Sequence, residues 1–146
     1  MVTLTESQLY NIIKETICQV LNEHHSGNHC VRFTAQNIDN PQELMAKYPS
    51  KLPNKYYHHS TNKFGRQPFD KREGEKLTLH IVGRLTNDKV DALVVDNPNS
   101  DNEIPHITLA TANGVRPVQS NIELKQHWNE IQPLDDYVKT TFTNNM

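Results

Sequence analysis

The chain has 146 residues, of which 35% are hydrophobic, and clear helix-like and strand-like periodicities predict one folded domain over residues 1–146 rather than a disordered chain. The net charge of −2 at pH 7 argues against a broad basic face, so no duplex nucleic acid is expected as a partner. The absence of an apolar run of about 18 residues and of a secretory leader predicts a cytoplasmic protein that does not bind a membrane.

The first predicted element is an amphipathic helix over residues 5–24, within an N-terminal segment that comprises residues 1–25. Thr5 can cap this helix together with Gln8, three residues later. Six apolar side chains recur on one face of the helix, namely Leu9, Ile12, Ile13, Ile17, Val20 and Leu21. A globular core is predicted to follow over residues 30–130.

Three histidines and two cysteines lie near the end of this helix. The histidines are His24, His25 and His29, and they lack the further spaced ligands of a metal site, so no metal and no cofactor is expected. Cys18 and Cys30 each fit a periodic apolar pattern, which favours small buried thiols over a disulfide between them. A Cys18–Cys30 bridge stays open as the alternative.

Short strands and two short helices make up the rest of the chain. Strands are predicted over residues 30–34 and 56–61, and a hairpin over residues 76–85 and 89–95. Asn40 signals a helix through about Lys47, and Ser120 with Glu123 forms a capping box for a helix through about Trp128. These elements predict an α+β domain with a mainly antiparallel sheet and flanking helices.

Two segments carry a histidine followed two residues later by a threonine: His59-Ser60-Thr61 and His106-Ile107-Thr108-Leu109. Because side chains alternate between the two faces of a strand, each segment places an imidazole and a hydroxyl on the same face. Two such strands side by side form a pocket with two imidazoles and two hydroxyls. His58 is an alternative to His59, and His80 on the predicted hairpin is a reserve candidate for the same surface.

This set of side chains suits cleavage of a phosphodiester without a metal. One neutral imidazole accepts a proton from the attacking oxygen, while the other imidazole, protonated, donates one to the leaving oxygen. The hydroxyls of Thr61 and Thr108 donate hydrogen bonds to the phosphate oxygens. The catalytic residues predicted from the motifs are therefore His59, His106, Thr61 and Thr108.

The paired motifs resemble the signature of the two-histidine (2H) phosphoesterase superfamily, over roughly residues 55–122. The resemblance implies a compact 2H phosphoesterase-like fold and a cyclic nucleotide or a cyclic-phosphate RNA end as substrate. The segment 113–121 is similar to one in RNA-repair-like members, which implies that Ser120 and Asn121 line the pocket. Residues 4–9 are similar to leaders of proteins from phages of gut bacteria and from their hosts, which suggests a phage enzyme that destroys immune signals in the host cytoplasm.

The predicted substrate-binding residues lie on both sides of the second motif. Residues 63–74 combine basic and aromatic side chains and are interpreted as a mobile lid, in which Phe64 or Phe69 stacks a base while Lys63 or Arg66 meets a phosphate. A solvated loop with two core-anchoring phenylalanines is the alternative. Beyond the motif, Arg116 is placed to bind phosphate. The remaining candidates are His58, Ser120 and Asn121.

The predicted function is hydrolysis of a cyclic phosphodiester in a small nucleotide or oligonucleotide signal, or in a 2′,3′-cyclic RNA end. Two alternatives stay open. The same histidines and threonines can form a nucleotide-binding sponge that does not cleave its ligand, or the protein can be a structural phage protein in which the two motifs are coincidental. The sequence predicts neither an oligomeric state nor a base preference.

Overall fold

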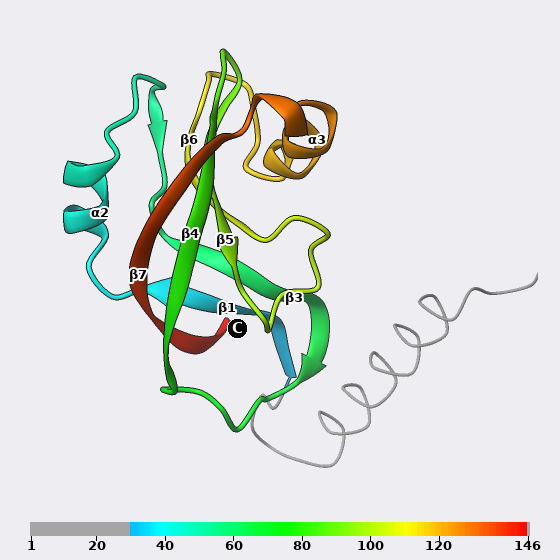
Figure 1. Ribbon diagram of the computed structural model, residues 1–146. Helices are drawn as coiled ribbons and strands as arrows, with labels where there is room; N and C mark the ends of the chain where they lie inside the picture. The colour runs from blue at the N-terminus through cyan, green and yellow to red at the C-terminus, as the bar shows by residue number, and fades with distance from the viewer. Residues whose placement is uncertain (1–29, 146) are drawn as a thin grey trace, which may run out of the picture.

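The computed structural model describes residues 30–145, and these form a closed antiparallel β-barrel (Figure 1). The six barrel strands are β1 (Cys30–Ile38), β3 (His59–Pro68), β4 (Lys76–Thr86), β5 (Val90–Asp96), β6 (His106–Thr111) and β7 (Gln132–Asn145). The other elements are the extra strand β2 (Asn54–Lys55), the helices α2 (Pro41–Lys47) and α3 (Gln119–Gln126), and the short helix η1 (Trp128–Glu130). The helix predicted over residues 5–24, Cys18 and the histidines His24, His25 and His29 lie outside the described residues.

The barrel closes because β5 and β6, which lie far apart in the order of the sheet, also pair with each other. The strands follow one another in the order β6, β3, β1, β7, β4 and β5, and the pairing of β5 with β6 completes the ring. The predicted α+β, 2H phosphoesterase-like fold is therefore wrong. The prediction failed mainly because it did not include β7. This strand pairs with both β1 and β4, although its sequence contains few apolar residues. Its inward side chains are Val138, Thr140 and Phe142, and the threonine weakens the alternating pattern.

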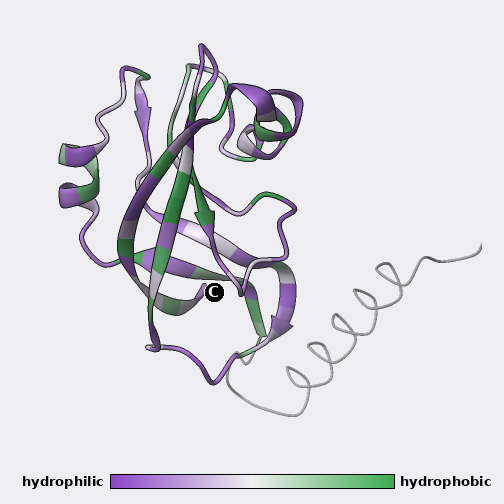
Figure 2. Ribbon diagram, viewed as in Figure 1, coloured by the Kyte–Doolittle hydropathy of each residue, from purple (hydrophilic) through white to green (hydrophobic). Residues whose placement is uncertain are grey.

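Alternation along β4 and β7 separates side chains that face the barrel interior from side chains on the outer face. Figure 2 shows hydrophobic and hydrophilic residues following one another along β4 and β7. The largest core cluster lies inside the barrel and extends under α2. Its buried members are Ile38, Leu44, Tyr57, Leu79, Ile81, Leu93, Val95, Ile107, Leu109 and Val138. Among residues 30–145, no helix is both long and apolar enough to cross a membrane.

Several predicted elements match the structure. The hairpin of β4 and β5 is confirmed, and so is α2, whose Asn40 cap accepts a hydrogen bond from the Glu43 amide at 3.2 Å. The capping box of α3 is wrong, because the helix begins at Gln119 without a side-chain cap. The lid predicted over residues 63–74 is also wrong in its first half, because residues 63–68 belong to β3.

Candidate active site

The two His-x-Thr motifs lie on neighbouring antiparallel strands of the barrel. Ser60 of β3 stands opposite Ile107 of β6, and both side chains are fully buried inside. The flanking histidines and threonines therefore point to the outer face, with His59 beside Thr108 and Thr61 beside His106. The two histidines occupy opposite corners of this square, about 8 Å apart at their Cβ atoms by standard sheet geometry. That spacing leaves room for one phosphate between the imidazoles.

A cavity of about 930 Å³ opens over this part of the sheet. It brings together eight of the eleven residues that the sequence predicted for the site: His58, His59, Thr61, Phe64, His106, Thr108, Arg116 and Asn121. Ser120 lies behind the wall, where its hydroxyl is buried 2.9 Å from that of Thr108. Lys63 and Arg66 do not line the cavity.

His106 is nearly enclosed at the base of the cavity, with 7% of its surface exposed. Its Nδ1 lies 2.8 Å from the carbonyl oxygen of Ile104, so this nitrogen carries a proton and donates it. The reactive nitrogen is therefore Nε2. Burial lowers the pKa of His106, whereas the hydrogen bond to Ile104 opposes this by favouring the protonated ring.

His59 is held between another histidine and an aromatic ring. Its Nδ1 lies 2.8 Å from Nδ1 of His58, which leaves Nε2 as its reactive nitrogen as well. The ring of Phe33 covers it at a centroid distance of 5.4 Å. Burial, followed by repulsion from His58 and His106, lowers the pKa of His59 to about 4. At neutral pH this imidazole is uncharged and able to accept a proton.

The backbone at Tyr57 explains how His58 and His59 come to face each other. Tyr57 adopts a left-handed conformation with φ of 51°, which is uncommon for a residue with a large side chain. Its ring is fully buried in the barrel core and its hydroxyl donates a hydrogen bond to the Tyr48 carbonyl. The resulting turn lies just before the start of β3, so His58 is not part of the strand. In a regular strand its side chain would point to the opposite face from that of His59, whereas here the two rings meet.

A polar network inside the barrel supports the motif on β3. Asn97 donates hydrogen bonds to the Ser60 hydroxyl at 3.1 Å and to the Asn62 side chain at 2.8 Å. Asn62 in turn donates to Gln36 at 3.0 Å, and Gln36 donates to Thr140. All five side chains are buried. Because Ser60 and Asn62 alternate with His59 and Thr61, this network fixes the strand that presents the outer residues.

The loop between β5 and β6 also belongs to the site, and the sequence reasoning missed it. Ser100 donates to the carbonyl oxygen of Thr61 at 2.8 Å, and the Asp101 amide donates to that of Asn62 at 2.7 Å. Asn102 follows them and lines the cavity. The polar run over residues 97–102, which ends shortly before the second motif, was the available signal, since polar loops beside strands often supply binding residues.

The charge of the cavity wall differs from that of the whole protein. Arg116 and Lys55 line it together with the three histidines, and no acidic residue does so among the described residues. The Lys55 ammonium donates to the carbonyl oxygens of Ser50 and Leu52. Arg116 is exposed and forms no ion pair with any residue of the range 30–145, so its guanidinium is available to an anion.

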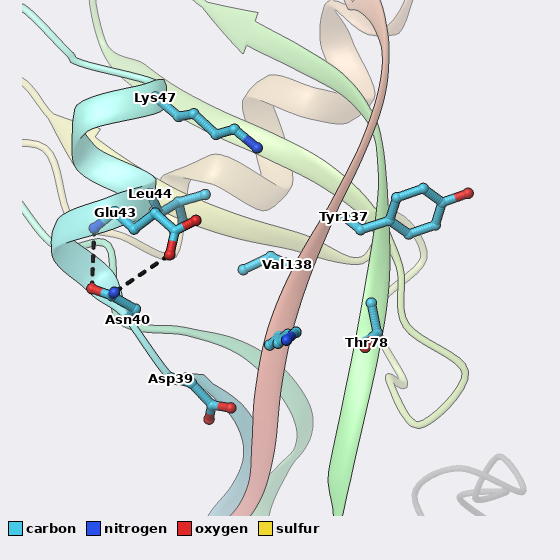
Figure 3. A pocket seen from close by; sticks show the side chains of 9 residues that line it. Asp39, Asn40, Glu43, Leu44, Lys47, Thr78, Tyr137 and Val138 are labelled. Carbon is cyan, nitrogen blue, oxygen red and sulfur yellow. Dashed lines mark hydrogen bonds between the residues drawn. The ribbon is translucent and has the colours of Figure 1, made fainter.

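The reserve candidate His80 does not join this site. It lies on β4, where its ring stacks on Tyr137 at 4.7 Å and its Nε2 contacts Asp135 at 2.6 Å. A second hollow of about 250 Å³ lies between α2 and β7 and is shown in Figure 3. Its described lining includes Glu43, Lys47 and Tyr137 but no histidine, so it lacks the paired imidazoles of the larger cavity.

Comparison with known proteins adds no family to this description. The sequence matches no protein-family model and no curated protein. The resemblance to 2H phosphoesterases therefore rests on two short motifs, which this chain carries on a different fold. The function has to be argued from the side chains in the cavity.

Proposed function

We propose that the cavity is the active site of a phosphodiesterase that hydrolyses a cyclic phosphodiester in a nucleotide, a cyclic oligonucleotide or a 2′,3′-cyclic RNA end. The observation that carries this proposal is the chemistry of the wall. Three imidazoles, two threonine hydroxyls and one guanidinium converge there, with no carboxylate among the described lining residues. In a chain of net charge −2, such a local excess of positive and donor groups attracts an anion.

We assign the base to His59 and the acid to His106. The proton prefers His106, because the Ile104 carbonyl oxygen stabilises its charged ring. It avoids His59, because burial, followed by repulsion from the two neighbouring imidazoles, disfavours a charge there. An entering phosphodiester anion between the rings favours protonation further, and His106 takes that proton first.

The reaction consumes one water molecule. Nε2 of His59 accepts a proton from the water as its oxygen forms a bond to phosphorus, and Nε2 of His106 donates a proton to the leaving ester oxygen as that bond breaks. The product is the opened phosphomonoester. The two histidines exchange protonation states, and solvent restores them, with exposed His58 connecting His59 to water.

The remaining residues hold the phosphate. The hydroxyls of Thr61 and Thr108 lie at the other two corners of the square and donate to non-bridging oxygens as charge develops. Ser120 accepts or donates at the Thr108 hydroxyl and so orients it. Arg116 neutralises the anion from the rim, and Asn121 supplies an amide beside it.

The experiment is incubation of the protein with 2′,3′-cyclic mononucleotides, cyclic di- and trinucleotides and cyclic-ended oligoribonucleotides, in EDTA, with products identified by mass spectrometry. We expect cleavage at pH 5.5 that falls about 100-fold to 10,000-fold in His59→Gln and His106→Gln. His80→Gln is the matched control, because this histidine lies outside the cavity, and it retains activity.

Two outcomes would replace the proposal. Tight binding with intact ligand recovered, in wild type and variants alike, would indicate a nucleotide-binding sponge. If the folded protein neither binds nor cleaves any of these compounds, a structural role is the remaining interpretation. Loss of all cleavage in EDTA, restored by a divalent cation, would contradict the assignment of the chemistry to the two imidazoles.

A further inference from the structure

Phe64 lies on a barrel strand, and its aromatic side chain is almost fully exposed to solvent. It is 84% exposed, lies in the middle of β3 and lines the cavity. Phe33 stands opposite it on β1, and the two rings stack at a centroid distance of 6.4 Å and an angle of 27°. An exposed phenylalanine gains nothing for the barrel core, so its orientation calls for another explanation.

A bulge in β3 turns Phe64 toward the site. By simple alternation from His59 and Thr61, Lys63 would share their face and Phe64 would point into the barrel. The register of β3 against β1 shifts between Thr34 and Ala35, where β3 contains one extra residue, Asn62. This shift moves Phe64 onto the outer face. Bulges are frequent beside active sites, where they redirect a side chain in this way.

The two phenylalanines continue the site without a break. Phe33 contacts His59 on one side and Phe64 on the other. Arg32 and Arg66 are exposed next to them in the two strands, and neither forms an ion pair with another residue in the described part of the chain. Flat aromatic rings flanked by arginines form the arrangement that binds single-stranded nucleic acid, with bases on the rings and phosphates on the cations.

We propose that Phe33 and Phe64 form a stacking platform for an unpaired nucleobase, and that the substrate class is a linear or cyclic oligonucleotide. The cavity volume of about 930 Å³ lies near the upper end of the range for small-molecule sites, which suits a ligand longer than one nucleotide. This inference rests on the proposed function only in placing the scissile phosphodiester at the two histidines. The stacking itself does not require cleavage.

The test measures binding of a fluorescently labelled, single-stranded oligoribonucleotide to the full chain, made cleavage-deficient by His106→Gln. The same strand with abasic residues is the second ligand. Adding Phe64→Ala weakens binding of the normal strand about 10-fold to 100-fold and leaves the abasic strand unchanged. Adding Phe64→Trp preserves binding. Phe69→Ala is the matched control, because Phe69 is exposed but does not line the cavity.

The outcomes separate this proposal from the proposed function. Equal binding of normal and abasic strands by every variant, or no binding of either strand, would overturn the platform even if the wild-type chain cleaves cyclic mononucleotides. Base-dependent binding that needs Phe64, in a wild-type chain that cleaves nothing, would keep the platform and overturn the catalytic assignment. Thermal unfolding of the Phe64 variants checks that the barrel is intact.

Discussion

The Nδ1 atoms of His58 and His59 lie 2.8 Å apart, and one proton must stand between them. This contact couples the two rings, because two lone pairs or two N–H groups could not face each other at that distance. One consequence is that removing His58 changes the titration of His59 rather than only the shape of the cavity.

His58→Gln is expected to raise the pKa of His59, since repulsion from His58 is one of the causes that lower it. The acid limb of the activity profile then moves to higher pH, while the alkaline limb stays in place. Profiles of kcat/KM for wild type, His58→Gln and the control His80→Gln measure this. If His58→Gln abolishes cleavage while His59→Gln retains it, His58 is the base.

The pH profile of cleavage is expected to be bell-shaped, with its maximum on the acidic side of neutrality. Activity rises through about pH 4 as His59 loses its proton. It falls again as His106 is deprotonated, and burial holds the pKa of that ring below its ordinary value. The two limbs belong to the coupled pair. A maximum at pH 8, measured as kcat/KM, would contradict both assignments.

The hydroxyl of Thr108 is expected to contribute more to catalysis than the hydroxyl that orients it. Thr108→Val removes a donor to the phosphate and lowers kcat about 100-fold. Ser120→Ala leaves that donor in place and only frees its rotation, so the loss is smaller, and KM changes little in either variant. Steady-state kinetics separate the two effects, with Thr78→Val on β4 as the matched control. Equal losses in both variants would indicate that Ser120 itself meets the substrate.

The stability of the barrel is expected to fall in mild acid because of His59. Its pKa is lower in the folded chain than in the unfolded chain, so the unfolded state binds the proton more readily. The stabilisation is complete above the unfolded pKa of about 6.5 and is lost as the pH falls toward about 4. Urea unfolding at pH 7 and pH 4.5 is expected to differ by about 2 kcal/mol more in wild type than in His59→Gln. An equal difference in both proteins would contradict the lowered pKa.

The buried amide of Asn97 is expected to stabilise the fold through β3. Asn97→Ala leaves the Ser60 hydroxyl and the side-chain amide oxygen of Asn62 without their donor, which costs about 2 kcal/mol of unfolding free energy. Exposed Asn129→Ala is the control and is expected to change the free energy by less than about 0.5 kcal/mol. Chemical denaturation compares them. An unchanged midpoint in Asn97→Ala would show that water replaces the lost bonds.

Local patterns in the sequence predicted the elements better than the fold. The strand around Ile107 and the hairpin of β4 and β5 could be predicted, because residues close together in the sequence determine them. Closure of the barrel could not be predicted in this way, because it depends on β7 pairing with β1 and β4 over long sequence separations. Its inward Thr140 resembles a surface residue until Gln36 is placed beside it.

The candidate site was predictable to the extent that it repeats a pattern. The His-x-Thr spacing was enough to select His59 and His106, whichever fold brings the strands together. The bulge at Asn62 was not predictable, so Phe64 and Lys63 were assigned to a mobile lid instead of opposite faces of β3. The stacking of His80 on Tyr137 likewise depends on pairing between distant strands.

The position of the site on the outer face of a closed barrel has a consequence for how this protein can change. Along β3, residues 59 and 61 meet the ligand, whereas residues 60 and 62 hold the network inside. Substitutions at the outer positions can alter ligand choice without repacking the interior, whereas the inner positions are constrained because their network holds the strand that carries the imidazole of His59. The outer face of β3 is thus selected for ligand binding and its inner face for stability. A change of ligand specificity therefore requires no change of fold.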